Sequence, residues 1–188
     1  MRRSLLRLLT LLAAPLAAQA AEIQLEAPDS SCHLDISSGN PTGAFSIVAD
    51  AAGTSCGCIS GAEFRVVGLT NDWFVTVTAS PQAIVTLGSP FGTGTNIAFA
   101  TCQPQRLVLF SVTISYIGSG TPPATMLRVE AHATPSNPQY SCPLILGDIG
   151  VTFCQMCVPG GMLFINQTGD CAVATNSETW SEVKHRYE

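Results

Sequence analysis

Apolar and polar side chains alternate along most of residues 45–165, and this alternation limits the folds that the chain can adopt. The segment MLRVEAHA at residues 126–133 places Leu127 and Val129 on one face and Arg128 and Glu130 on the other. The segment RLVLFSVTISYI at residues 106–117 alternates in the same way, which puts Leu109 opposite Phe110. A period of two residues matches a β-strand with one buried face. We therefore expect strands and no interior helix in this region.

Turn-forming residues separate the alternating segments at close spacing. They include Asn40-Pro41, Ser80-Pro81, GSPFGTGTN at residues 88–96, Gly118-Ser119-Gly120 and TPSNPQ at residues 134–139. We expect roughly nine or ten short strands, because frequent turns without interior helices favour an antiparallel β-sandwich over an α/β layer.

The first twenty residues have the three parts of a secretory signal peptide. Three arginines precede an apolar run at residues 8–18, and the small-residue sequence AQA ends the segment at residue 20. The run is interrupted by Pro15 and is short for a transmembrane helix. We predict a signal peptide at 1–20, a sandwich domain at 21–174 and a tail at 175–188. No transmembrane segment is expected after cleavage, and the predicted location is the periplasm, the cell surface or the medium.

The charge balance argues against two classes of partner. Cleavage would remove three of the eight basic residues, which leaves five against thirteen acidic residues and a net charge of −8. Nucleic acids and anionic membranes both require a basic surface, so neither is expected to bind.

Eight cysteines lie beyond the predicted signal peptide, and an even number in an exported chain predicts a disulfide framework. They are Cys32, Cys56, Cys58, Cys102, Cys142, Cys154, Cys157 and Cys171. Eight cysteines allow 105 connectivities, so spacing alone does not identify the pairs. Cys56 and Cys58 would point the same way in an extended segment, so we expect each to pair elsewhere.

The sequence Cys154-Gln-Met-Cys157 has the spacing of redox dithiols and of zinc knuckles. A redox dithiol begins a helix, whereas the flanking VTF and VPGG favour a strand and then a turn. A zinc site would need a second pair nearby. We expect structural disulfides here, with Cys171 as one candidate partner; a metal site and a redox dithiol are the alternatives. No cofactor is predicted.

Four aromatic residues form the candidate binding surface, because exposed aromatic side chains on a sandwich stack on sugars or contact proteins. They are Phe91, Trp73, Tyr116 and Tyr140, of which Trp73 is the most suited to the core.

No local catalytic motif occurs in the chain: there is no G-x-S-x-G, no H-E-x-x-H, no calcium loop and no phosphate-binding loop. We therefore predict a secreted, non-catalytic binding or structural module whose partner is a protein or a glycan at the cell surface. The alternative is a secreted hydrolase with a dispersed site, for which His132, Glu63 and Glu130 are the candidates. His132 is otherwise expected on a solvated strand face. Asn166-Gln-Thr168 matches a glycosylation sequon.

The tail NSETWSEVKHRYE at residues 176–188 predicts a short helix with Trp180, Val183 and Tyr187 on one face. A helix of this length needs a surface to dock on. The tail either packs on the domain or is recognised by another protein through Trp180, Val183, Lys184 and Tyr187.

Several segments carry a resemblance to known proteins. The order GAEFRVVGL, DWFVTV, a Gly-Thr strand ending in Cys102 and LVLFSVTISY resembles cohesin-like β-sandwich segments of exported bacterial proteins. The end of the chain is similar to that of uncharacterised secreted bacterial proteins, which finish with a Cys-containing strand, a GG-x-x-x-IN-like element, a last cysteine and T-W-x-x-[IV]-K-x-x-Y. The expected sandwich is of cohesin-like, immunoglobulin-like or jelly-roll type, and the cohesin resemblance implies a non-catalytic fold that displays a binding face. Cellulosomal cohesins lack such dense cysteines, so dockerin binding does not transfer to this chain.

Overall fold

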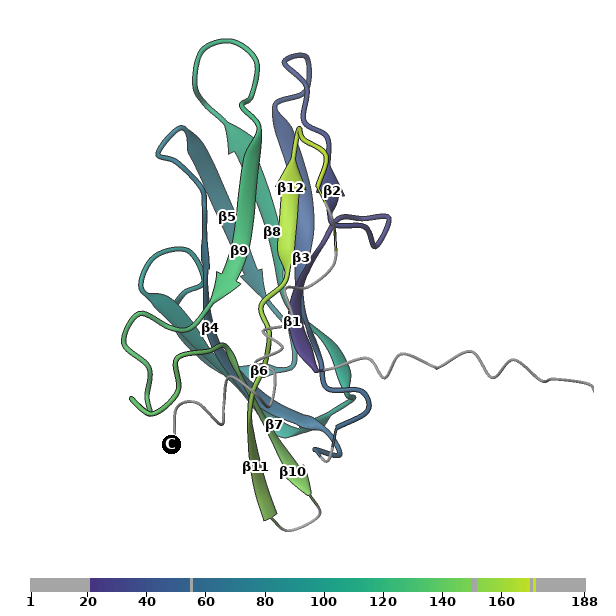
Figure 1. Ribbon diagram of the computed structural model, residues 1–188, viewed down its shortest axis with the longest axis vertical. Coiled ribbons are helices and arrows are strands. Elements are labelled where there is room, and N and C mark those ends of the chain that lie inside the picture. The colour runs from purple at the N-terminus through teal and green to yellow at the C-terminus, as the bar shows by residue number, and fades with distance from the viewer. Residues whose placement is uncertain (1–20, 55, 150–151, 170, 172–188) are drawn as a thin grey trace, which may run out of the picture.

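The computed structural model describes residues 21–54, 56–149, 152–169 and 171, which form an all-β structure (Figure 1). Within these residues there are twelve strands and no helix, which confirms the expected fold class with slightly more strands than expected. The strands are β1 (Glu22–Glu26), β2 (His33–Leu34), β3 (Thr42–Asp50), β4 (Ile59–Val67), β5 (Trp73–Ala79), β6 (Ala83–Ser89), β7 (Gly94–Gln103), β8 (Arg106–Tyr116), β9 (Thr125–Glu130), β10 (Leu144–Ile149), β11 (Thr152–Cys157) and β12 (Met162–Ile165). The predicted signal peptide and C-terminal helix lie outside the described residues.

One layer is a four-stranded antiparallel sheet in the order β1-β3-β8-β5. The long strands β3 and β8 form its centre, and β1 and β5 are its edges.

No helix of the described residues is long and apolar enough to cross a membrane.

The other layer is a branched sheet in the order β11-β10-β4-β9-β12-β2. Strand β7 also pairs with β4, and β6 pairs with β7 outside this order. The pairing of β12 with β2 is parallel, and the other pairings of this layer are antiparallel. Figure 1 shows β10 and β11 as a hairpin that projects from one end of the sandwich.

The two layers enclose one apolar core, as the alternation predicts. Phe45 and Ile47 of β3 and Val112 of β8 are almost fully buried, and Phe64 of β4 meets Phe110 of β8 edge to face. The ring centroids of this last pair are 6.1 Å apart, so it joins the two sheets directly. Burial of this many large side chains is the main favourable contribution to the stability of such a sandwich.

The expected alternation is wrong at one point of β8. Ile47 pairs with Phe110, whereas the next residue of β3, Val48, pairs with Val108, so Leu109 has no opposite residue. Such a β-bulge inserts one extra residue into the strand, so the residues of β8 before the bulge point to the opposite side from the one that strict alternation predicts. Leu109 and Phe110 are therefore both buried, although the period-two pattern places them on opposite faces.

Candidate functional site

The eight cysteines form four disulfides in the described residues, with Cα–Cα distances of 5.5–5.9 Å, and none is free. The pairs are Cys32–Cys171, Cys56–Cys154, Cys58–Cys102 and Cys142–Cys157. The expectation that Cys56 and Cys58 have separate partners is confirmed. The suggestion that Cys171 forms a disulfide with the CQMC segment is wrong, because Cys171 is bonded to Cys32, which directly precedes β2.

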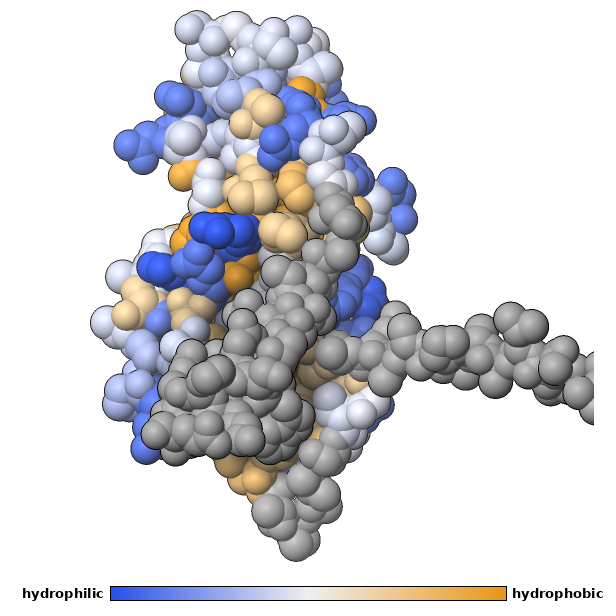
Figure 2. Space-filling model, viewed as in Figure 1, coloured by the Kyte–Doolittle hydropathy of each residue, from blue (hydrophilic) through white to orange (hydrophobic). Residues whose placement is uncertain are grey.

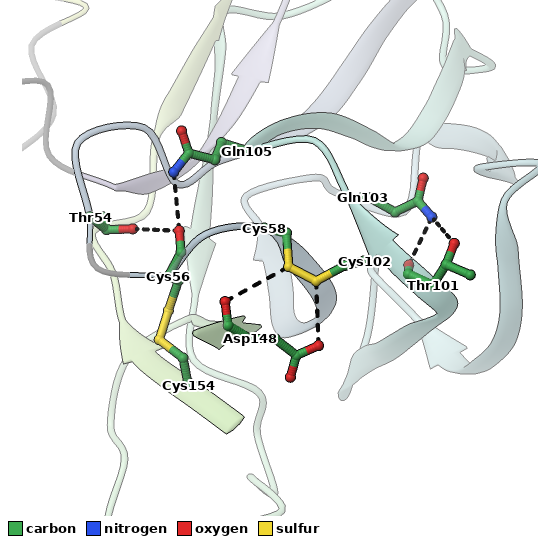
Figure 3. Close-up of a disulfide and its surroundings, with 9 residues drawn as sticks. All are labelled: Thr54, Cys56, Cys58, Thr101, Cys102, Gln103, Gln105, Asp148 and Cys154. Atoms are coloured by element: carbon green, nitrogen blue, oxygen red, sulfur yellow. Dashed lines mark hydrogen bonds between the residues drawn. A yellow bond between two sulfur atoms is a disulfide. The ribbon is translucent and has the colours of Figure 1, made fainter. Parts of the chain in front are cut away.

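Two disulfides lie side by side where β4 begins and β7 ends (Figure 3). The carboxylate of Asp148 lies 3.3 Å from the sulfur of Cys102, and Gln105 donates a hydrogen bond to the carbonyl of Cys56. Asp148 is close enough to Cys58 and Cys102 for the three to hold a metal ion after reduction. In the disulfide state these sulfurs are not thiolates, so the geometry favours structural bridges over a metal or redox site.

The four predicted aromatic residues lie in different surroundings. Trp73 is only 6% exposed, and its ring lies 5.2 Å from that of Tyr116, so these two pack together at the edge of the core. Phe91 is half-buried against Phe45, with ring centroids 6.4 Å apart. Tyr140 is half-buried in the loop at residues 131–143. Their participation in binding stays a prediction.

The loop at residues 131–143 covers part of β4 and borders a hollow of about 620 Å³. Arg65, Glu130, His132 and Tyr140 line this hollow together with four prolines. The guanidinium of Arg65 lies 2.8 Å from Glu130, so the charged groups neutralise each other. The hollow thus lacks a free carboxylate of the kind that a hydrolase would use as general base.

The three candidate catalytic residues are held in separate structural contacts. Glu63 is 2% exposed and accepts a hydrogen bond from the backbone of Ser136 at 2.9 Å. His132 follows β9 and is half-buried, which corrects the expected solvated strand face; its Nδ1 accepts from the backbone of Thr134. Within the described residues no hydrogen bond joins any two of His132, Glu63 and Glu130. The geometry gives the hydrolase alternative no support.

The position of His132 also explains the glycine at residue 94. Gly94 has a φ of 124°, and a Cβ there would lie 2.3 Å from the His132 ring. Only glycine fits both the backbone conformation and the packing.

The outer side of β3, β8 and β5 forms an uncharged surface, here called the hydroxyl face. Its three rows, in register across the strands, are Thr42–Ser115–Phe74, Ala44–Thr113–Thr76 and Ser46–Ser111–Thr78. Most of these side chains are exposed, and Phe74 is 61% exposed. Sequence alternation predicted which of these residues share a face, but not that the three strands are neighbours.

Ion pairs border the hydroxyl face at the end where β8 begins. Arg106 lies 2.8 Å from Asp50 and also pairs with Glu26 of β1. The hydrogen bond to Asp50 raises the pKa of the guanidinium, which stays protonated. Burial raises the pKa of the neighbouring Glu22. The charged groups therefore lie at one end of the hydroxyl face, and none of its nine positions carries a charge.

The other sheet exposes several large apolar side chains on separate strands. On β6, Ile84 and Leu87 are more than 60% exposed and Val85 is 42% exposed. Phe153 on β11 and Met126 on β9 are further exposed apolar residues of this layer. Figure 2 shows apolar residues in the middle of the visible face, near β9 and β12, with strongly hydrophilic residues directly beside them.

No protein-family model matches the chain, and no curated protein matches it. Three solved structures are similar in fold. The cohesin module of a family 33 glycoside hydrolase from Clostridium perfringens has a TM-score of 0.53 at 9% identity, over 79% of this chain and 98% of the module. The seventh ScaB type I cohesin from Pseudobacteroides cellulosolvens has a TM-score of 0.53 at 11% identity, over 81% and 96%. A chain of a type I cohesin–dockerin complex from Clostridium thermocellum has a TM-score of 0.50 at 9% identity, over 78% and 99%.

These similarities show that the fold is cohesin-like, as the middle segments of the sequence suggested. At such low identity they concern the fold alone. The predicted tail motif, with Trp180, Val183, Lys184 and Tyr187, lies outside the described residues.

Proposed function

We propose that the protein is an exported, non-catalytic module that binds another protein through the hydroxyl face. The observation that carries this proposal is the absence of charge from nine adjacent outward positions on three strands. Exposed strand faces are usually populated with charged residues, which keep a soluble surface hydrated. A large neutral area on this sheet is therefore better suited to contact than to solvation.

The composition of the hydroxyl face resembles the anatomy of protein interfaces. Interface centres are depleted in Lys, Glu and Asp and enriched in aromatic residues, while charges occupy the rim. Phe74 is an exposed aromatic within the face, and the ion pairs of Arg106 lie at its end. The hydroxyls of Ser and Thr both donate and accept, so they form hydrogen bonds without the desolvation cost of a charge.

The fold supports a binding role for the module. One of the similar structures is a cohesin in complex with a dockerin, so this architecture presents a protein-binding surface in that protein. The four disulfides favour an oxidising compartment, which agrees with the predicted signal peptide.

The proposal is tested by placing a charge at the centre of the face. Thr113 is exposed and lies in the middle row, so Thr113→Lys alters binding without disturbing the core. Thr101 is an exposed strand residue of the other sheet, which makes Thr101→Lys the matched control. The oxidised wild type and both variants are immobilised and exposed to the exported proteins of the source organism. Each retained protein is then purified and its affinity for the three forms is measured by calorimetry.

We expect a protein that binds the wild type and Thr101→Lys equally and Thr113→Lys at least about tenfold more weakly. Equal affinity for all three forms would move the site away from the hydroxyl face. Retention on polysaccharide instead of protein would replace the proposed partner class by a glycan.

A further inference from the structure

Strand β6 is an edge strand without charged side chains to protect it. Among the described strands it pairs only with β7, so one side of its backbone has no strand partner. Every residue from Ile84 to Ser89 is exposed. An edge strand of this kind presents unpaired N–H and C=O groups that another chain can join.

Natural edge strands are normally protected by charged residues, and β6 has none. Residues 73–105 contain no Asp, Glu, Lys, Arg or His, so neither β6 nor its neighbour β7 carries a charge. The strand instead exposes Ile84, Val85 and Leu87 by 63%, 42% and 62%. Among the described edges, β1 carries Glu22 and Glu26, and β5 and β11 each expose one large apolar side chain. Among the described edge strands, β6 therefore exposes the most large apolar side chains.

We propose that β6 pairs with β6 of a second copy of this chain, antiparallel about a twofold axis. A single exposed strand is sufficient for such an interface, because an antiparallel pair of identical strands is self-complementary. The chain carries a net charge of −5, so two copies repel each other, and this repulsion is smallest where the contact surface carries no charge, as on β6.

The local backbone sets the register of the pair. The pairing of β6 with β7 shifts between Ala83 and Val85, and Gly88 has a φ of 80°, so the regular part of the edge is centred on Thr86. With Thr86 on the twofold axis, Val85 of each copy lies opposite Leu87 of the other. These two apolar cross-strand pairs are shielded from water in the dimer. The short pairing predicts a weak dimer, with a dissociation constant of about 10–100 μM.

The test is sedimentation velocity of the oxidised protein from about 1 μM to about 1 mM. We expect the wild type to pass from monomer to dimer in this range. Leu87→Lys is expected to stay monomeric, because the added charge faces the apolar Val85 of the other copy. Ile117→Lys changes a 68% exposed residue that lies just beyond β8 and should dimerise like the wild type.

A charge swap tests the register itself. In the double variant Val85→Glu/Leu87→Lys, each introduced acid lies opposite an introduced base of the other copy, so association should return. Hydrogen exchange should show concentration-dependent protection of amides 84–88 and none at residues 73–79 of β5.

A wild type that stays monomeric to about 1 mM, or a Leu87→Lys variant that dimerises like the wild type, overturns the proposal. A double variant as monomeric as Leu87→Lys overturns the antiparallel register. Protection of β6 only after addition of another protein would identify a different occupant. The hydroxyl face lies on the other sheet, so Thr113→Lys should dimerise normally and the two proposals fail separately.

Discussion

The side-chain oxygen of Asn166 accepts a hydrogen bond of 2.6 Å from the backbone amide of Ile36, 130 residues earlier in the chain. The side-chain nitrogen of the same residue donates to the carbonyl of Pro122 at 3.0 Å. Asn166 has a φ of 55°, a left-handed conformation that asparagine tolerates better than most residues. One side chain thus connects the end of β12 to the segments after β2 and before β9.

Replacement of Asn166 by alanine should lower the free energy of unfolding by about 2–4 kcal/mol, because two partly buried backbone groups lose their partners and the backbone is strained. Asn166→Asp keeps the acceptor for Ile36 but near neutral pH places a carboxylate oxygen against the carbonyl of Pro122, so it should also lower the stability, and less so at acidic pH, where the protonated carboxyl group can donate. Urea unfolding of the oxidised proteins measures both. A loss below about 0.5 kcal/mol for the alanine variant would contradict this role.

The sequon at Asn166 should remain unmodified in the folded protein. Its amide nitrogen is engaged with Pro122 and its side chain is only partly exposed, so a glycan would have to break this contact. Incubation of the folded, oxidised protein with an oligosaccharyltransferase and its lipid-linked donor, followed by intact-mass analysis, tests the prediction. The expected result is an unmodified chain, and full occupancy at Asn166 would contradict the observed packing.

Mild reduction should open the Cys58–Cys102 disulfide before the Cys56–Cys154 disulfide. A thiolate must reach a sulfur atom to break the bond. Cys102 is exposed, whereas Cys56 is fully buried and Cys154 is 8% exposed. Alkylation after limited treatment with glutathione, followed by peptide mapping, gives the order. Earlier labelling of Cys56 and Cys154 would contradict the burial argument.

Glu22→Gln should stabilise the protein at neutral pH. Burial raises the pKa of Glu22, with smaller opposing effects from Gln24 and Arg106. A raised pKa means that the folded state prefers the protonated form, so stability falls as pH rises through that pKa. Asp50 and Glu26 act in the same direction as burial.

The advantage of Glu22→Gln should decrease as the pH falls and vanish well below about 4.3, where the carboxyl group is protonated in both states. Unfolding curves of the wild type and the variant in matched buffers from neutral to acidic pH measure this difference. A constant difference across the range would point to a cause other than ionisation.

The sequence by itself determined the fold class and the residues that face the core in most strands. Alternation at Phe45, Ile47, Val112 and Leu127 is a local property, because successive residues of any strand point to opposite sides. The even number of cysteines likewise predicted that all of them form disulfides, and the spacing of Cys56 and Cys58 predicted that these two have different partners.

Only the tertiary structure decided the rest, because it depends on which distant segments become neighbours. The disulfide Cys32–Cys171 joins residues 139 positions apart, and no local pattern distinguishes it from the other connectivities. The bulge at Leu109 and the burial of Glu63 arise from strand register and from a loop that folds over β4. The hydroxyl face and the exposed edge of β6 also depend on which strands become neighbours in the sheets. Alternation predicts an outward side chain, but the neighbours of a strand decide whether that side chain lies in a surface shared with other strands or at an open edge.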